Sequence, residues 1–165
     1  MKIKSKIVPC LWFDSQAEAA AKFYTSIFKG SKIRKTTHYT EAGREAHGRE
    51  PGSVMTVIFE LSGQSFTALN GGPVFKFNEA ISFQVMCDTQ KEVDYFWSKL
   101  SKGGQEGPCG WLKDKFGVSW QVVPSMMEEL FSDKDPKRAG RTMQAMLKMK
   151  KLNIAELKRA HAGSH

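Results

Sequence analysis

The sequence is poor in cysteine and has no long apolar run. It contains three cysteines, Cys10, Cys87 and Cys109, and no Cys-x-x-Cys spacing. An odd number without paired spacing argues against a disulfide framework or a zinc site and fits reduced thiols. No window reaches about 18 uncharged apolar residues, which excludes a transmembrane helix. The basic residues 1–6 precede a short strand-like run without a small-residue cleavage site, so we expect no signal peptide and a cytoplasmic protein.

Acidic residues are also scarce, and the imbalance is local. The chain carries 25 Lys and Arg residues against 17 Asp and Glu residues, a formal charge of +8. Residues 134–165 contain nine of the basic residues but only Asp135 and Glu156 as acidic ones, so this segment holds +7 and the rest about +1. We therefore expect no nucleic-acid partner for the main body. A solvated helix face explains the basic tail best, and an anionic partner is the alternative.

What the sequence does contain is enough apolar residues for one domain with a sizeable core, 41% of its 165 residues. Within it lies an internal repeat. Residues 7–13 and 81–87 are apolar runs of strand length, 74 positions apart, and the residues after them align as well. The same shift pairs Ile7 with Ile81, Asp14 with Asp88, Ser15 with Thr89, Gln16 with Gln90, Glu18 with Glu92, Phe23 with Trp97 and Gly30 with Gly104.

The matched residues predict the same helix signals in both copies. Ser15 and Thr89 are each expected to cap a helix, and the glutamate three residues later is expected to bond back to the cap. Glycines at 30 and 103–104 are suited to the left-handed residue that follows a helix. Two capping boxes in register with two strands and two helix ends indicate a duplicated strand–helix unit.

Three further strands are predicted after each helix. They lie at residues 32–39, 54–61 and 65–69 in the first half and at residues 105–108, 110–113 and 119–123 in the second, so each half is βαβββ. Helices are expected to begin at Ser125 and Asp135 and to cover residues 153–162. The predicted fold class is α+β. Its predicted divisions are a domain at 1–124 (module one 1–72, module two 80–124), a helical tail at 125–162, and residues 163–165, which resemble an expression-tag remnant.

Two tandem βαβββ modules, each with Asp-Ser or Asp-Thr after its first strand, resemble the vicinal-oxygen-chelate superfamily. This superfamily includes glyoxalase I, extradiol dioxygenases, fosfomycin-resistance enzymes and bleomycin-binding proteins. Within it, the chain is similar to the PhnB-like group, often labelled 3-demethylubiquinone-9 3-methyltransferase. The similarity is carried by residues 9–14, 21–24, 69–72, 82–85 and 109–121.

The resemblance implies a cupped mixed sheet around a small-molecule cleft, the glyoxalase/bleomycin-resistance fold, with one module forming each half. It also implies a homodimer. In catalytic relatives, side chains on the first and last strands of both modules hold a divalent metal, usually through His, Glu or Gln.

The residues at the implied metal positions are poor ligands. The resemblance places the first-strand positions near Val8 or Pro9 and at Ser82, and the last-strand positions at Asn70 and Gln121. This set contains no imidazole and no carboxylate, which divalent ions prefer. The four histidines lie elsewhere, at His38, His47, His161 and His165. We expect no tightly held metal and no cofactor, with Ser82 and Gln121 as degenerate metal positions.

The expected function is binding of a small organic ligand in the cleft. The amides are expected to orient ligand oxygens and the tryptophans to supply flat apolar walls, although core packing explains each tryptophan equally well. For Cys10, a buried apolar role is favoured over a nucleophile. The predicted ligand-binding residues are Trp12, Asn70, Gln84, Trp111, Trp120 and Gln121, and no catalytic residue is assigned.

Three alternatives stay open. The first is a metal-dependent lyase or dioxygenase whose ligands lie at other positions. The second is the methyltransferase that the group's label names; it is disfavoured because the first strand is followed by Asp14-Ser15-Gln16 and not by a glycine-rich turn. The third is a protein that binds a partner through its basic tail.

Overall fold

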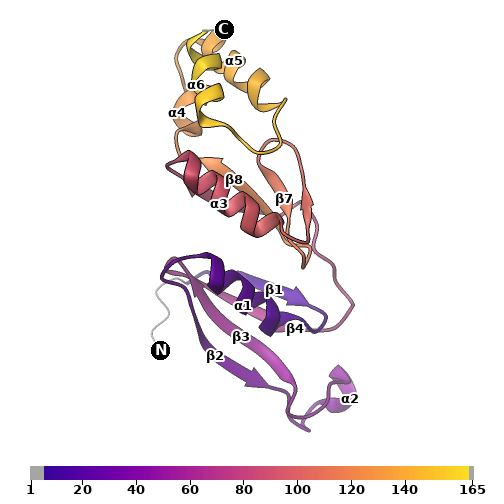
Figure 1. Cartoon of the computed structure of the whole chain (residues 1–165). Helices are drawn as coiled ribbons and strands as arrows, with labels where there is room; N and C mark the ends of the chain where they lie inside the picture. Colours follow the sequence, from indigo (N-terminus) through magenta and orange to yellow (C-terminus); the bar gives the residue numbers. More distant parts are fainter. Residues whose placement is uncertain (1–5, 164–165) are drawn as a thin grey trace. The chain divides into compact units, whose positions relative to one another are not determined.

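The computed structural model describes residues 6–163, so residues 1–5 and the last two residues of the predicted tag remnant lie outside it. The chain divides into two compact units, with the boundary between Phe77 and Asn78. Each unit contains one four-stranded mixed sheet and the helices that cover it (Figure 1). In the described part of the chain, no helix is both long and apolar enough to cross a membrane.

The first unit has the predicted βαβββ order, and its sheet has the strand order β1-β4-β3-β2. β1 runs parallel to β4, whereas β3 is antiparallel to both β4 and β2. The predicted strand at residues 54–61 is confirmed in its bounds, and the segment between β2 and β3 contains a short helix. The elements are β1 (Cys10–Phe13), α1 (Ala17–Ile27), β2 (Lys32–His38), α2 (Arg44–His47), β3 (Val54–Leu61) and β4 (Gln64–Asn70).

The two faces of this sheet differ because side chains alternate along each strand. Leu11, Phe59 and Ala68 are buried on the face that α1 covers. Tyr24 of α1 stacks on Phe59 with ring centroids 6.1 Å apart. The alternate positions, such as Trp12, lie on the other face and are more exposed. The apolar face thus packs against α1 and forms the core of the unit, whereas the open face is available for other contacts.

The second unit repeats this topology with the strand order β5-β8-β7-β6 and a parallel β5–β8 pair. The matching strand orders confirm two βαβββ modules and the α+β fold class. α3 covers the face that carries Val85, Leu112 and Val122, and it contributes Trp97 to this core. The elements are β5 (Phe83–Cys87), α3 (Gln90–Ser101), β6 (Gln105–Glu106), β7 (Trp111–Lys113), β8 (Ser119–Pro124), α4 (Met127–Phe131), α5 (Pro136–Met146) and α6 (Ile154–Ala162).

The predicted capping box is confirmed in the second module and wrong in the first. The Thr89 hydroxyl accepts from the backbone nitrogen of Glu92 at 3.3 Å, and the Glu92 carboxylate accepts from that of Thr89 at 3.1 Å. In the first module the capping position falls to Gln16, which makes no side-chain cap. The start of α1 is held instead by Asn70, whose side-chain oxygen accepts from the backbone nitrogen of Ala17. A partner distant in sequence therefore replaces the local cap.

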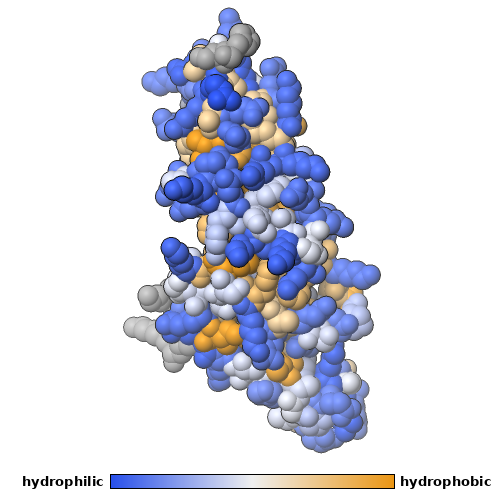
Figure 2. Space-filling view, viewed as in Figure 1, coloured by the Kyte–Doolittle hydropathy of each residue, from blue (hydrophilic) through white to orange (hydrophobic). Residues whose placement is uncertain are grey.

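The three C-terminal helices form an apolar cluster at one end of the second unit (Figure 1). The predicted helix start at Asp135 is confirmed, since its side chain accepts from a backbone nitrogen in the first turn of α5, and Asn153 caps α6 in the same way. Ser125 does not start α4 but donates to the carboxylate of Asp88 at 2.6 Å. The visible surface over these helices is mostly hydrophilic (Figure 2). The cluster consists of Met127, Leu130, Met149, Leu152 and Leu157.

This helical tail is bonded to module two through its backbone. Cys109 and Gly110 donate from their backbone nitrogens to the carbonyls of Met149 and Lys150, each at 2.7 Å. The Gln90 side chain of α3 accepts from the backbone nitrogen of Ile154 at 2.8 Å. The compact unit accordingly runs from Asn78 through the tail. The predicted division after residue 124 stays a prediction.

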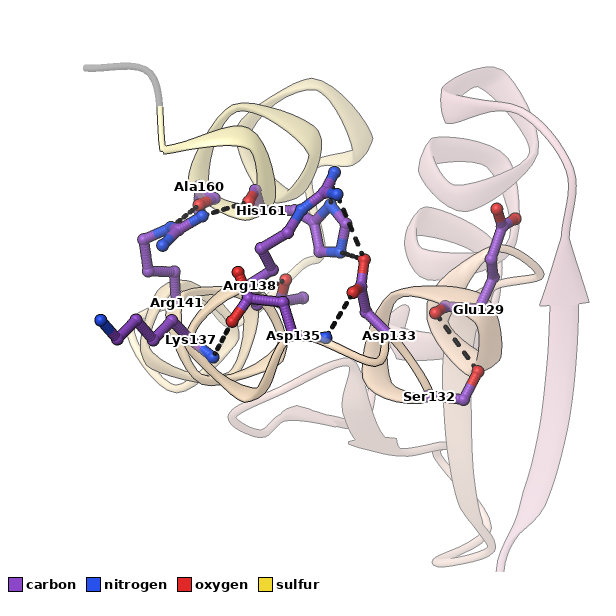
Figure 3. Close-up of polar contacts among 10 residues, drawn as sticks. Glu129, Ser132, Asp133, Asp135, Lys137, Arg138, Arg141, Ala160 and His161 are labelled. Carbon is purple, nitrogen blue, oxygen red and sulfur yellow. Dashed lines mark hydrogen bonds and ion pairs between the residues drawn. The ribbon is translucent and has the colours of Figure 1, made fainter.

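A cluster of charged residues connects α5 to α6 through ion pairs and hydrogen bonds (Figure 3). Asp133 lies 3.1 Å from Nε2 of His161 and 3.6 Å from Nη1 of Arg138. Arg141 donates to the carbonyls of Ala160 and His161, at 2.9 and 2.7 Å, which satisfies acceptors at the end of α6. The basic residues of the tail thus include some that hold its own helices together.

Candidate functional site

Three of the predicted ligand-binding residues lie in one row on the open face of the second sheet. Gln84 on β5 is paired with Gln121 on β8, and Gln121 is paired with Trp111 on β7. Strand alternation produces this row, because the residues next in sequence, such as Val85 and Val122, are buried on the α3 side. The sheet therefore places two amides and an indole side by side on the face that α3 leaves open.

The amides of this row are joined by hydrogen bonds. Nε2 of Gln121 donates to the hydroxyl of Ser82 at 2.8 Å. Nε2 of Gln84 lies 3.4 Å from Oε1 of Gln121, a longer contact. Gln84 is the exposed member, whereas Gln121 is half-buried. The bonds orient the Gln121 amide, and the exposed Gln84 side chain lies beside it.

A pocket of about 400 Å³ begins at Trp111. Inside it, Lys113 forms an ion pair with Glu79, and this hydrogen bond lowers the pKa of the Glu79 carboxyl. The hydroxyl of Ser119, a residue 2% exposed, has no hydrogen-bond partner among the described residues. The pocket is lined by Glu79, Gln105, Glu106, Gly107, Pro108, Trp111, Leu112, Lys113 and Ser119.

Trp120 lies on the opposite face from the row. It is 3% exposed, and its Nε1 donates to the buried carboxylate of Asp114 at 2.8 Å. Its strand neighbours on the same face, Val122 and Leu112, are also buried. Its place in the strand alternation directs Trp120 into the core, and its predicted role in a ligand site stays a prediction.

Asn70 also has a structural position. Its side-chain oxygen accepts from Ala17, its Nδ2 donates to the carbonyl of Val54 at 3.0 Å, and it is 7% exposed. Both ends of the amide thus bind backbone groups, and its predicted role as a ligand-orienting residue stays a prediction. The strand register also shows that the first-module residue equivalent to Gln121 is Thr67 and not Asn70. Thr67 pairs with Cys10 in the first module as Gln121 pairs with Gln84 in the second.

Trp12 lies on the open face of the first sheet, in a different unit from the row. Its Nε1 donates to the carbonyl of Gly72 at 2.8 Å, and Phe75 packs edge-on at 4.9 Å. A pocket of about 580 Å³ opens beside it. That pocket is lined by Trp12, Tyr39, Ala46, His47, Gly48, Arg49, Leu69, Gly71, Gly72, Pro73 and Val74.

Three polar residues of this pocket, Tyr39, His47 and Arg49, were not predicted as site residues. They come from the end of β2 and from the charged loop that follows it, where no hydrophobic periodicity marks a position as facing inward. The only usable signal was the presence of cations in a loop between two strands of one module, and such loops are mostly solvated.

Cys10 does not have the environment of an activated nucleophile. It is exposed on β1, and partial burial raises the pKa of its thiol. A reactive thiolate needs the opposite shift, produced by a nearby cation or a helix N-terminus.

The residues at the implied metal positions do not fit a divalent ion. Ser82 and Gln121 are hydrogen-bonded to each other, and both amide ends of Asn70 bind backbone groups. None of these side chains is an imidazole or a carboxylate. Across residues 6–163, moreover, no three side chains of His, Cys, Asp or Glu converge as a metal site would require.

The chain matches one protein family over most of its length. The profile of the family described as 3-demethylubiquinone-9 3-methyltransferase matches residues 5–123. The match ends just before the three C-terminal helices, so the tail lies outside it. No curated protein matches the chain.

Several solved structures share the fold. The PhnB protein from Bacillus cereus is 35% identical, with 73% of this chain and 99% of that chain covered and a TM-score of 0.63. The fosfomycin resistance protein FosX from Mesorhizobium loti is 10% identical, with 80% and 100% covered and a TM-score of 0.55. FosX from Listeria monocytogenes, in a complex with Mn(II) and 1S,2S-dihydroxypropylphosphonic acid, is 15% identical, with 79% and 98% covered and a TM-score of 0.50.

Proposed function

The chain belongs to the family described as 3-demethylubiquinone-9 3-methyltransferase, the PhnB-like group with the glyoxalase fold, and we propose that it binds a small organic ligand on the open face of its second sheet. Gln84 and Gln121 bind ligand oxygens, and Trp111 packs against the apolar part of the ligand. Trp12, in the other unit, stays a proposed ligand-binding residue.

The observation that carries this proposal is the row of Gln84, Gln121 and Trp111 on three neighbouring strands. The amide of Gln121 is fixed through Ser82, so less side-chain entropy is lost when a ligand binds. The adjoining pocket of about 400 Å³ falls in the usual size range of small-molecule sites.

We propose that the ligand binds without a tightly held metal. Ligand oxygens that a metal would coordinate in FosX-like relatives would here accept hydrogen bonds from amide nitrogens. Titration with Mn²⁺, Ni²⁺ or Zn²⁺ tests this part, with weak binding expected. Stoichiometric, sub-micromolar binding that Gln121→Ala abolishes would contradict it, and would favour a metal-dependent lyase or dioxygenase.

Ligand binding itself is tested with catechol and fosfomycin as metal-free probes, followed by amide and side-chain NMR shifts. At least one probe should shift the side-chain amide signals of Gln84 and Gln121 and the indole signal of Trp111. Affinity should fall about tenfold in Gln121→Ala, the cost of one or two hydrogen bonds to a ligand. Gln144→Ala removes an exposed amide on α5 and serves as the matched control. Binding that is equally strong in Gln84→Ala, Gln121→Ala and the control, or no shift with either probe, would overturn the proposal.

The methyl transfer in the family's description has less support from this chain. Each sheet contains a single parallel pair, and the turn from β1 to α1 has no glycine. A nucleotide-like cofactor usually binds a glycine-rich turn in a parallel βαβ sheet. S-adenosylmethionine should therefore leave the melting temperature unchanged, and a saturable increase would favour the methyltransferase.

We also propose that the protein is a homodimer, as in related paired-module proteins. Ile81 and Met86, at the edge strand of the second sheet, are 75% and 52% exposed, which is apolar surface suited to a protein contact. Light scattering coupled to gel filtration should give twice the mass of the chain, and a clean monomer would contradict the dimer.

A further inference from the structure

The pocket beside Trp12 in the first unit combines aromatic walls with a fixed cation. The indole of Trp12 and the ring of Tyr39 form two of its sides, and Leu69 adds an aliphatic surface. Tyr39 is held by its hydroxyl, which donates to the carbonyl of Asn70 at 2.7 Å. Its ring packs against His47 with centroids 4.6 Å apart. These contacts connect the loop after β2 to the sheet and give the pocket ordered walls.

Its backbone floor is formed by Gly71 and Gly72. A Cβ atom on Gly71 would lie 2.2 Å from a ring atom of Trp12, so a side chain there would displace the indole. Gly72 has a φ of +101° and accepts a hydrogen bond from the same indole. Glycine at both positions lets the chain pass directly under Trp12, and this keeps the pocket open beside the ring.

Arg49 supplies the charge. Its Nη2 donates to the backbone carbonyl of Asp14 at 2.8 Å and lies 3.3 Å from the Asp14 carboxylate. The Asp14 side chain is about half exposed, so this carboxylate offsets the guanidinium charge only in part. The side chain of Arg49 is 24% exposed, and the bonds to Asp14 fix it at the pocket wall.

Two other carboxylates of this loop are paired with Arg44. Glu50 accepts two hydrogen bonds from Arg44, at 2.9 and 3.0 Å, and Glu41 lies 3.5 Å from the same guanidinium. Arg44 thus pairs with two acidic residues of the loop that carries Arg49. The surface around α2 is hydrophilic, in keeping with this charged loop (Figure 2).

His47 adds a hydrogen-bond donor next to Arg49. Its Nδ1 accepts from the backbone nitrogen of Arg49 at 3.0 Å. A neutral imidazole whose Nδ1 is an acceptor carries its proton on Nε2, so this edge can donate. Nε2 lies 3.3 Å from the carbonyl of Ala42, a long contact that a better acceptor can replace.

We propose that this pocket binds a small anion, a carboxylate, phosphate or phosphonate that carries a flat apolar group. The anionic end binds Arg49 and His47, and the apolar part packs against Trp12 and Tyr39. The volume of about 580 Å³ is sufficient for a ligand of this class. The site lies wholly in the first unit, and it depends on neither Gln84 nor Gln121.

Phenylphosphonate and benzyl alcohol are the matched probes, since both have a phenyl ring and only the first is charged. In the full-length protein, phenylphosphonate should shift the NMR signals of the Trp12 indole and of the Gly71 and Gly72 amides. Its affinity should fall about tenfold in Arg49→Gln and clearly less in Arg49→Lys, which keeps the charge but not the two-pronged donor geometry. Arg34→Gln, which removes an arginine that is paired with Glu60 and does not line the pocket, should leave the affinity unchanged.

The fold of each variant is checked from the amide spectrum, and Arg49→Lys keeps the test valid if Arg49→Gln perturbs the loop. Benzyl alcohol that binds as tightly as phenylphosphonate would overturn the proposal. So would an affinity for phenylphosphonate that is the same in Arg49→Gln, or no shift of the Trp12 indole at about 10 mM, which would place any affinity beyond the millimolar range. Because Gln121→Ala leaves this pocket intact, failure of one proposed site is distinguishable from failure of the other.

Discussion

The side-chain oxygen of Asn70 accepts a hydrogen bond from the backbone nitrogen of Ala17 at 2.8 Å, across 53 residues of sequence. The same amide donates to the carbonyl of Val54, so one side chain joins the start of α1 to β3 and β4. In the second module Pro124 has the equivalent strand register, opposite Cys87, and the helix is capped locally by Thr89. The two modules therefore secure the start of their helices in different ways.

Asn70→Ala should destabilise the protein by about 1–3 kcal/mol, because one buried and one partly buried backbone group lose their partner. Urea unfolding measures this loss. Asn78→Ala removes an exposed local contact, to the backbone nitrogen of Ala80, and should change stability by less than about 0.5 kcal/mol. If Asn70→Ala unfolds like the wild type but weakens probe binding, Asn70 acts on a ligand after all.

Asp114 organises the turn between β7 and β8. Its carboxylate accepts from the backbone nitrogens of Phe116 and Val118, at 2.8 and 3.1 Å, and from the indole of Trp120. Asp114→Asn keeps the shape but replaces an acceptor oxygen with a donor, which should cost about 1–3 kcal/mol. A double-mutant cycle with Trp120→Phe isolates the shared bond, and a coupling energy near zero would show that Trp120 does not depend on Asp114.

Gln90 joins α3 to the C-terminal tail. Its Oε1 accepts from the backbone nitrogen of Ile154, and its Nε2 lies 3.2 Å from the carbonyl of Leu152. Gln90→Ala should therefore speed hydrogen exchange at Ile154 and lower stability by about 1–2 kcal/mol. Gln144→Ala, an exposed amide on α5, should do neither. Unchanged exchange at Ile154 in Gln90→Ala would mean that other contacts hold the tail, such as the backbone bonds of Cys109 and Gly110 and the ion pair of Lys151 with Asp94.

The sequence was informative wherever the controlling contact is local or periodic. The box of Thr89 and Glu92 spans three residues, and strand alternation explains why Gln84, Gln121 and Trp111 share a face once their strands are paired. Alternation along β8 alone does not say which side α3 covers, and so it could not decide between a ligand site and the core for Trp120. The cap of α1 depends on Asn70, which only the folded sheet brings near Ala17. The pocket at Arg49 likewise depends on where an aperiodic loop meets the sheet.

Acid should loosen the contact between α5 and α6. The backbone N–H of Asp135 lowers the pKa of Asp133, and the charges of Arg138 and His161 add to this effect. Because the folded state has the lower pKa, the stabilisation is complete above the unfolded value of about 4 and is lost as pH falls through the folded one. Asp133→Asn should thus be less stable than the wild type at pH 6, with a smaller loss between pH 4 and pH 2.

The matched control for this prediction is Glu129→Gln, an exposed carboxylate on α4 (Figure 3). Its acid unfolding should parallel that of the wild type. The carboxyls of Glu79 and Asp94 also have lowered pKa values, so the stability of the wild type and of Asp133→Asn should both still fall to some extent in acid. An acid transition that is identical in Asp133→Asn and the wild type would show that the cluster does not contribute.

The thiol of Cys87 should be unreactive in the native protein. The residue is fully buried at the end of β5, and burial together with the charges of Glu92 and Asp88 raises its pKa to about 12. Because the pKa of this thiol is higher in the folded state than in the unfolded state, its contribution to stability is fully present below the ordinary thiol pKa. That contribution is lost as pH rises toward 12. At pH 8, a disulfide reagent should modify exposed Cys10 and spare Cys87 until the chain unfolds. Cys87→Ala should remove part of the loss of stability at alkaline pH, whereas Cys10→Ala should not. Rapid modification of Cys87 in the folded Cys10→Ala variant would contradict the burial of Cys87.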